Sequence, residues 1–149
     1  MILISHRGNI EGRMVPFENQ PNYIDTAIAA GYDVEIDVWY EVESGKLYLG
    51  HDKADYQIDI DWLDERSDKL WIHCKNMDSL SYFNKINTFG PEYNYFSHDK
   101  DMGVLTSYGY IWSTNLYDNG ILVLPEVFEK TPIETTIGIC SDIIQNYKK

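Results

Sequence analysis

The sequence predicts an α/β fold in one domain, a reduced and helix-poor (β/α)8 TIM-like barrel. Short apolar, β-prone segments recur at a steady spacing along the 149 residues. In the first half they alternate with helical segments, a pattern typical of βα units around a parallel sheet. A complete (β/α)8 barrel usually needs about 250 residues. The later helices would therefore have to be reduced to loops, and an open, mixed sheet is the alternative.

The first half supplies the alternation. MILIS at 1–5 is apolar and favours a strand, and PNYIDTAIAAG at 21–31 favours a helix that Gly31 ends. DVEIDVWY at 33–40 alternates polar and apolar residues, as a strand does. The remaining expected elements are a short extended piece at 46–52, a helical turn at 62–67, a strand at 70–75 and a helix at 77–89.

The second half contains strand-like segments with little room for helices between them. The final residues favour a short helical tail. A helix-poor second half would leave flanks of the sheet uncovered, so a homo-oligomer is a hypothesis. The expected strands lie at 93–97, 103–107, 110–113, 121–125 and 136–142.

Charge and composition exclude several classes of partner. The net charge of −12 argues against a nucleic-acid-binding surface and against adhesion to anionic membranes. No segment approaches the roughly 18 apolar residues of a membrane span, and the N-terminus lacks the features of a signal peptide. Cys74 and Cys140 lie in apolar, strand-like runs, which favours buried free thiols and a cytoplasmic location over a disulfide.

The segment DVEIDV is the most informative one for chemistry. In a strand, Asp33, Glu35 and Asp37 share one face, and the intervening apolar residues share the other. A helix-covered parallel sheet normally has two apolar faces, and buried carboxylates repel each other and lose their hydration. A divalent cation with oxygen ligands would solve both problems. The alternative is a half-exposed antiparallel strand with a solvated acidic face.

Three further short segments carry polar groups that ordinary turns and helix caps also contain. They are His6-Arg7-Gly8, Glu18-Asn19 and Gly50-His51-Asp52. Together with Glu35-Ile36-Asp37, their order resembles that of the glycerophosphodiester phosphodiesterase family, within the phosphatidylinositol-phospholipase-C-like superfamily that includes sphingomyelinase D relatives. The resemblance covers residues 3 to 52 well. Beyond them, the segments LWIHCKN and GICSD are compatible with later strands of that family.

The resemblance implies roles for particular residues. Glu35 and Asp37 would be metal ligands, and His6 and His51 would be the acid–base pair on opposite sides of the phosphorus. Arg7 would hold a phosphate oxygen, and Lys75 would also contact the phosphate. Barrel active sites lie at the carboxyl ends of the strands, where inward-pointing side chains of this kind would meet.

His73 departs from the family pattern, which has a glutamate there. It could bind the metal, which would shift the preference toward Mn²⁺ or Zn²⁺. It could instead be a third histidine near the phosphate or a satisfied interior residue. Trp112, near a strand end, is expected either to wall the substrate or to pack in the core.

The predicted function is that of a phosphoric diester hydrolase acting on a small, glycerophosphodiester-like substrate. It would depend on Mg²⁺ or Ca²⁺, with Mn²⁺ as a further candidate. Two alternatives stay open: a lyase-type phosphodiesterase that stops at a cyclic phosphate, and a non-catalytic relative that binds metal or phosphate.

Overall fold

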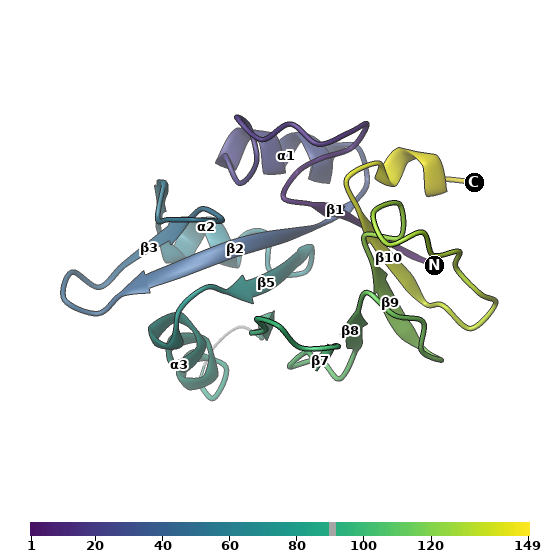
Figure 1. Ribbon diagram of the computed structural model, residues 1–149. Coiled ribbons are helices and arrows are strands. Elements are labelled where there is room, and N and C mark those ends of the chain that lie inside the picture. Colours follow the sequence, from purple (N-terminus) through teal and green to yellow (C-terminus); the bar gives the residue numbers. More distant parts are fainter. Residues whose placement is uncertain (90–91) are drawn as a thin grey trace.

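The computed structural model describes residues 1–89 and 92–149, and one curled, mixed sheet of ten strands dominates it. The strands fan round an arc from β3 and β2 through β1 and β10 to β8 and β7 (Figure 1). The strands are β1 (Ile2–His6), β2 (Asp33–Glu41), β3 (Lys46–Leu49), β4 (Tyr56–Ile58), β5 (Leu70–Cys74), β6 (Asn94–Phe96), β7 (Val104–Leu105), β8 (Ile111–Ser113), β9 (Gly120–Val123) and β10 (Gly138–Ser141). The helices are α1 (Pro21–Ala29), α2 (Ile60–Asp64), α3 (Met77–Ile86) and the 3₁₀ helix η1 (Ile144–Tyr147).

Most of the sheet is parallel. The strands β6, β5, β2, β1, β10, β9 and β8 follow one another through parallel pairs. Three strands depart from this direction: β3 pairs antiparallel with the end of β2, β4 pairs antiparallel with β3, and β7 pairs antiparallel with β8. The carboxyl ends of the parallel strands therefore meet at one edge of the sheet.

The predicted reduced, helix-poor (β/α)8 TIM-like barrel is wrong. The described residues form a sheet-dominated, mixed structure with only three α-helices, so helices do not alternate with the strands. The chain after β6 has loops and an antiparallel strand where a barrel would need helices, because its connections are short. The structure is closer to the open, mixed sheet that the sequence left as the alternative.

Most individual elements were nevertheless predicted. The expected strands at 1–5, 33–40 and 70–75 correspond to β1, β2 and β5. The helix expected at 77–89 ends earlier, at Ile86, and β4 was not predicted. Both cysteines are free and buried, as expected. None of the helices in the described chain combines the length and apolar character needed to cross a membrane.

The two faces of the sheet have different contents. Val34, Ile36 and Val38 of β2 face the helices and join one core cluster with Ile24 of α1 and Phe83 of α3. The opposite, inner face carries a second cluster, made of Ile4, Trp71, Phe96, Trp112, Ile121, Val123 and Cys140. Strand alternation places Glu35 and Asp37 on that inner face, beyond its apolar cluster.

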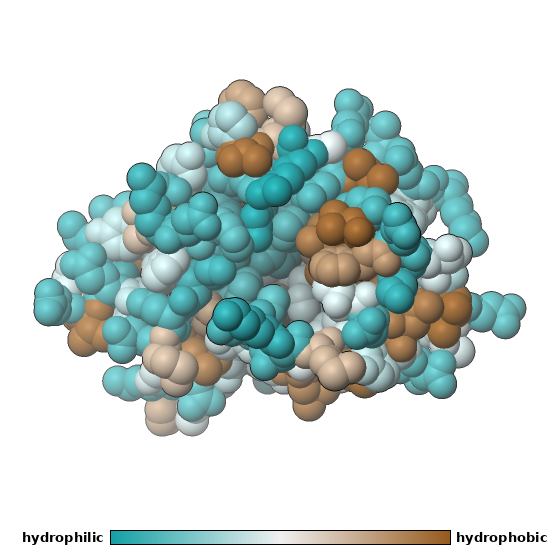
Figure 2. All heavy atoms as spheres, viewed as in Figure 1, coloured by the Kyte–Doolittle hydropathy of each residue, from teal (hydrophilic) through white to brown (hydrophobic). Residues whose placement is uncertain are grey.

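The face of the molecule seen in Figure 2 is mainly hydrophilic, in keeping with the net charge of −12. Figure 2 shows hydrophilic side chains over most of the visible face, with hydrophobic residues in separate small patches. Exposed apolar side chains occur around the second half of the chain, including Leu105, Tyr117 and Phe128. Whether the protein forms a homo-oligomer stays a prediction.

The packing of α3 on the sheet gives a direct stability test. Phe83 is fully buried, so Phe83→Ala should lower the free energy of unfolding by about 3–5 kcal/mol. Phe89→Ala is the matched control, because Phe89 is 88% exposed and its loss should change stability by less than about 0.5 kcal/mol. Urea unfolding followed by circular dichroism measures both. Equal effects of the two substitutions would contradict this packing.

Candidate functional site

The candidate residues converge at the carboxyl ends of neighbouring parallel strands. His6 ends β1 and stands beside Glu35 in the strand register, while Asp37 of β2 stands beside His73 of β5. Lys75 follows β5 directly. The sheet thus brings together, on its inner face, residues that lie up to about half the chain apart.

Glu35 and Asp37 are almost completely buried, at 2% and 0% exposure. Two oxygen atoms of this pair, Oε2 of Glu35 and Oδ1 of Asp37, have no hydrogen-bond partner among the described residues. A buried carboxylate oxygen without a partner is costly, and two of them side by side are more so. Additional positive charge beside the two carboxylates would therefore lower the cost of burying them.

His73 places a ring nitrogen where a cation bound to the two carboxylates would need a further ligand. Its Nδ1 lies 3.1 Å from Oδ1 of Asp37 and 3.7 Å from Oε1 of Glu35. On the other side of the ring, Nε2 is 3.3 Å from the backbone carbonyl oxygen of His98. A carbonyl only accepts hydrogen bonds, so Nε2 carries a hydrogen, and in the neutral ring the Nδ1 lone pair faces the carboxylates. Metal-binding histidines are commonly held in this way.

The residues present fit a divalent cation. One ligand atom from each of Glu35, Asp37 and His73 lies within 4.8 Å of the others, and all three side chains are buried. Carboxylate oxygens suit Mg²⁺, Ca²⁺ and Mn²⁺, and the imidazole nitrogen extends the range toward Mn²⁺ and Zn²⁺. Of the three interpretations of His73, this arrangement favours the ligand.

The pKa values of the two carboxyl groups are shifted in opposite directions. Burial, and then the neighbouring Asp37, raise the pKa of Glu35 well above its usual range. Burial alone would also raise the pKa of Asp37, but the close approach of His51 and His73 and the charge of Arg7 outweigh it and hold that pKa well below its usual range. Asp37 is therefore the stronger acid of the two, and a bound cation would favour the ionised form of both.

His6 and His51 flank the carboxylate pair. Nε2 of His6 is 3.8 Å from Oε2 of Glu35, and Nδ1 of His51 is 3.5 Å from Oδ2 of Asp37. The His6 side chain is nearly enclosed, whereas that of His51 is 39% exposed. Gly50 makes the turn before His51, because a Cβ there would collide with the backbone carbonyl of Lys53. The two histidines thus approach the pair from different strands and loops.

Arg7 contacts two carboxylates of the protein itself, which the sequence did not indicate. Its Nε is 3.0 Å from Oδ2 of Asp37 and one terminal nitrogen is 3.2 Å from Oε2 of Glu18, so both carboxylates engage it. Its other terminal nitrogen lies 3.5 Å from Nε2 of His51. Asn19 completes this corner, since its side-chain amide donates to Asp37 and accepts from the Asp37 backbone N–H. These contacts give Arg7 a role in holding Asp37; its contact with a phosphate stays a prediction.

Lys75 and Trp112 occupy different surroundings. Nζ of Lys75 is 3.8 Å from Oδ1 of Asp37, which places an ammonium group at the carboxylates. Trp112 packs in the inner core cluster against Trp71 and Phe96, at ring-centroid distances of 5.6 and 4.7 Å. Core packing is thus what the structure shows for Trp112, and a substrate contact stays a prediction.

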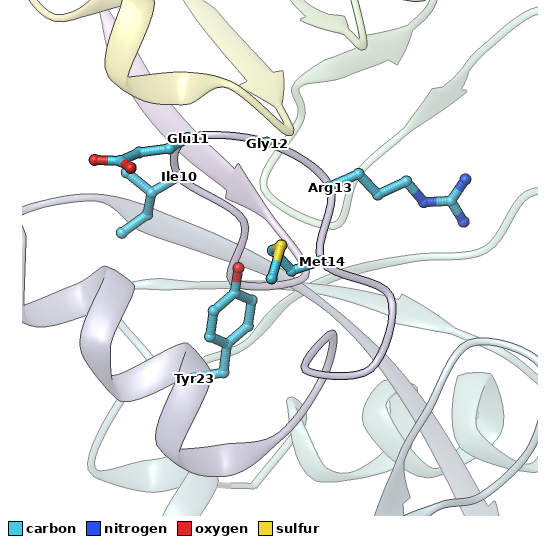
Figure 3. A pocket seen from close by; sticks show the side chains of 6 residues that line it. All are labelled: Ile10, Glu11, Gly12, Arg13, Met14 and Tyr23. Atoms are coloured by element: carbon cyan, nitrogen blue, oxygen red, sulfur yellow. The ribbon is translucent and has the colours of Figure 1, made fainter.

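A small cavity of about 40 Å³ is lined by Trp112 and His98 among others, and two larger cavities also lie near the candidate residues. One, of about 530 Å³, is lined by His73, Lys75, Ser97 and His98 among others and opens beside the site. The other, of about 480 Å³, lies under the loop at 10–14 (Figure 3). Its described lining includes none of the candidate residues, and Arg13 points away from it. The cavity of about 530 Å³ is therefore the one that could receive part of a substrate.

Asn9 and Asp142 are buried members of the site that sequence reasoning did not select. Asp142 is 2.8 Å from His6, and Asn9 donates to both Asp142 and Glu18. The available signals were the polar Ser-Asp pair that ends the last predicted strand and the asparagine directly after His6-Arg7-Gly8. Neither signal indicates by itself that the first and last strands are neighbours.

Cation binding predicts a measurable stabilisation. A cation bound only by the folded protein should raise the free energy of unfolding by about 2.7 kcal/mol at 100 times its dissociation constant. Thermal unfolding with Mg²⁺, Ca²⁺ or Mn²⁺ against chelator measures this. Glu35→Gln should remove the response, while Glu41→Gln, an exposed residue of the same strand, should keep it. A response of equal size in both variants would contradict binding at Glu35.

Comparisons with known proteins do not identify a family for this chain. A scan against protein-family models finds no matching family, and searches of curated proteins and of solved structures find no match. The short motifs and the geometry of the residues described above are therefore the features that point to a function.

Proposed function

We propose that the protein is a metal-dependent phosphodiesterase that acts on a small phosphodiester of the glycerophosphodiester type. The observation that carries the proposal is the buried Glu35–Asp37–His73 group, which has a histidine on either flank and carboxylate oxygens without a hydrogen-bond partner among the described residues. The resemblance of the four short motifs to the glycerophosphodiester phosphodiesterase family supports the same function.

The two flanking histidines suit both proton transfers of the reaction. Cleavage of a phosphodiester needs a base for the attacking oxygen and an acid for the leaving oxygen, and histidine serves both roles near neutral pH. His6 and His51 approach the carboxylate pair on Glu35 and on Asp37 respectively. A phosphate seated between them would have one imidazole toward each of its two ester oxygens.

The remaining charges would bind and orient the phosphate. A divalent cation held by Glu35, Asp37 and His73 would withdraw charge from the non-bridging oxygens. Lys75 borders the 530 Å³ cavity and supplies an ammonium group to the same oxygens. Arg7 keeps Asp37 ionised and in place through its Nε contact. A bound divalent cation, together with Lys75, would offset the negative charge of the carboxylates where an anionic substrate would enter.

The two alternatives differ from this proposal in the product they form or in the residues they need. A lyase-type phosphodiesterase would use the same groups and release a cyclic phosphate, because a hydroxyl of the substrate would attack in place of water. A non-catalytic relative would need the cation-binding group but not two proton carriers. The presence of His6 and His51 beside the carboxylates favours catalysis over binding alone.

Turnover of an aryl phosphodiester and of a glycerophosphodiester tests this proposal. We expect activity that requires Mg²⁺, Ca²⁺ or Mn²⁺ and is abolished by chelator. His6→Ala and His51→Ala should each lower kcat by about 10²- to 10⁴-fold, with circular dichroism spectra unchanged.

Phosphorus NMR of the product separates a monoester from a cyclic phosphate. Cation binding without turnover of either substrate would favour the non-catalytic relative. Turnover that survives chelator and both histidine substitutions would refute the proposal.

A further inference from the structure

Asp142 lies directly behind His6 because the first and last strands are neighbours. β1 and β10 pair in parallel with Ser5 beside Ser141, so the next residues of the two strands stand side by side. Oδ1 of Asp142 is 2.8 Å from Nδ1 of His6, and both residues are buried. The backbone N–H of Asp142 donates to Glu126, which fixes the aspartate from behind.

This contact determines which nitrogen of His6 is available. A carboxylate only accepts hydrogen bonds, so the hydrogen of the neutral ring sits on Nδ1. Nε2, the nitrogen that lies 3.8 Å from Glu35, then carries the lone pair. Burial alone would raise the pKa of Asp142, but hydrogen bonds from His6 and Asn9 outweigh it and keep that pKa below its usual range. Asp142 therefore acts as an acceptor.

Asn9 holds Asp142 in a single orientation. Its Nδ2 donates to Oδ1 of Asp142 at 2.7 Å and to Oε1 of Glu18 at 3.1 Å. Its Oδ1 accepts from the Met14 backbone N–H and from the Tyr23 hydroxyl, each at 3.1 Å. Because the Met14 N–H can only donate, the amide cannot be turned round. Asn9 is fully buried and uses its whole hydrogen-bonding capacity here.

Gly8 allows this arrangement. It has a φ of +94°, and a Cβ on it would lie 2.5 Å from the Tyr23 ring. With glycine there, the ring packs against the loop and points its hydroxyl toward it, as Figure 3 shows. The glycine of the His6-Arg7-Gly8 motif thus serves the support of the histidine as well as the turn.

We propose that Asp142 and Asn9 are positioning residues of the site: Asp142 fixes the neutral His6 ring with Nε2 toward the carboxylate pair, and Asn9 holds Asp142 in place. Through Glu18, the same network reaches Arg7 and Asp37. One buried chain of hydrogen bonds and ion pairs therefore supports both a flanking histidine and a carboxylate of the cation site. The consequence for catalysis rests on the proposed function, but the state of the His6 ring does not.

Nitrogen NMR of the intact protein with ¹⁵N-labelled histidine tests the proposal without any substrate. The nitrogen shifts and their couplings to the ring protons show which nitrogen bears the hydrogen, and a His6→Gln spectrum identifies the His6 signals. At about pH 8.5, above the ordinary range of imidazole protonation, the wild type should show hydrogen on Nδ1 of His6. Hydrogen on Nε2 would overturn the proposal without recourse to any variant.

Substitutions then test the two supporting residues. Asp142→Ala should move the His6 hydrogen toward Nε2, and Asn9→Ala should give a mixture of the two forms. Asn87→Ala is the matched control, since Asn87 makes two hydrogen bonds with the Tyr93 backbone far from His6. It should leave the His6 signals unchanged. A His6 spectrum unaltered by Asp142→Ala, or altered equally by the control, would overturn the proposal.

The rate measurement separates this proposal from the proposed function. In an active enzyme, Asp142→Ala should lower kcat by about 10- to 100-fold with little change in KM. If the wild type proves inactive while His6 carries its hydrogen on Nδ1 and responds to Asp142→Ala, the proposed function fails and the positioning stands. Full activity in Asp142→Ala would overturn the positioning role alone.

Discussion

Two buried carboxylates on one strand, Glu35 and Asp37, impose the constraint around which the rest of the site is arranged. They lie on the inner face of β2 with almost no contact with solvent. Ionised side by side, they would repel each other and lose their hydration. Three polar neighbours reduce that cost: Arg7 and Lys75 by charge, and Asn19 by hydrogen bonds.

The neighbours do not remove the cost completely. Arg7 divides its charge between Asp37 and Glu18, and the Lys75 ammonium lies 3.8 Å from the nearest carboxylate oxygen. One oxygen of each carboxylate still lacks a hydrogen-bond partner in the described structure. In the neutral His73 ring, the Nδ1 lone pair points at the carboxylates. Together these features fit a bound divalent cation better than a site completed by protein groups alone.

The sequence predicted the local elements and the polar cluster better than the architecture. Alternation in β2 was enough to assign Glu35 and Asp37 to one face, and short motifs at strand ends were enough to select His6, His51 and His73. The barrel prediction failed because strand spacing does not determine strand direction, and β3, β4 and β7 pair antiparallel in a mixed sheet. In this chain, the segments after β6 form loops and an antiparallel strand.

The contacts that no local pattern could supply are those between distant residues. Asp142 meets His6 only because β10 pairs with β1, and nothing in either segment specifies that pairing. Arg7 lies beside Asp37, but its contact with Glu18 could not be predicted, since the position of Glu18 depends on the fold of the 8–20 loop. Trp112 lies in the core because β8 turns its side chain toward Trp71 and Phe96.

Anomalous diffraction from crystals of the protein grown with Mn²⁺ would show whether Glu35, Asp37 and His73 hold a cation. We expect an anomalous peak within about 2.0–2.6 Å of a carboxylate oxygen of Glu35, one of Asp37 and Nδ1 of His73. Crystals of Glu35→Gln should lack that peak. A site without anomalous density at saturating Mn²⁺, with the wild-type carboxylates paired only to Arg7 and Lys75, would refute a cation site at these residues.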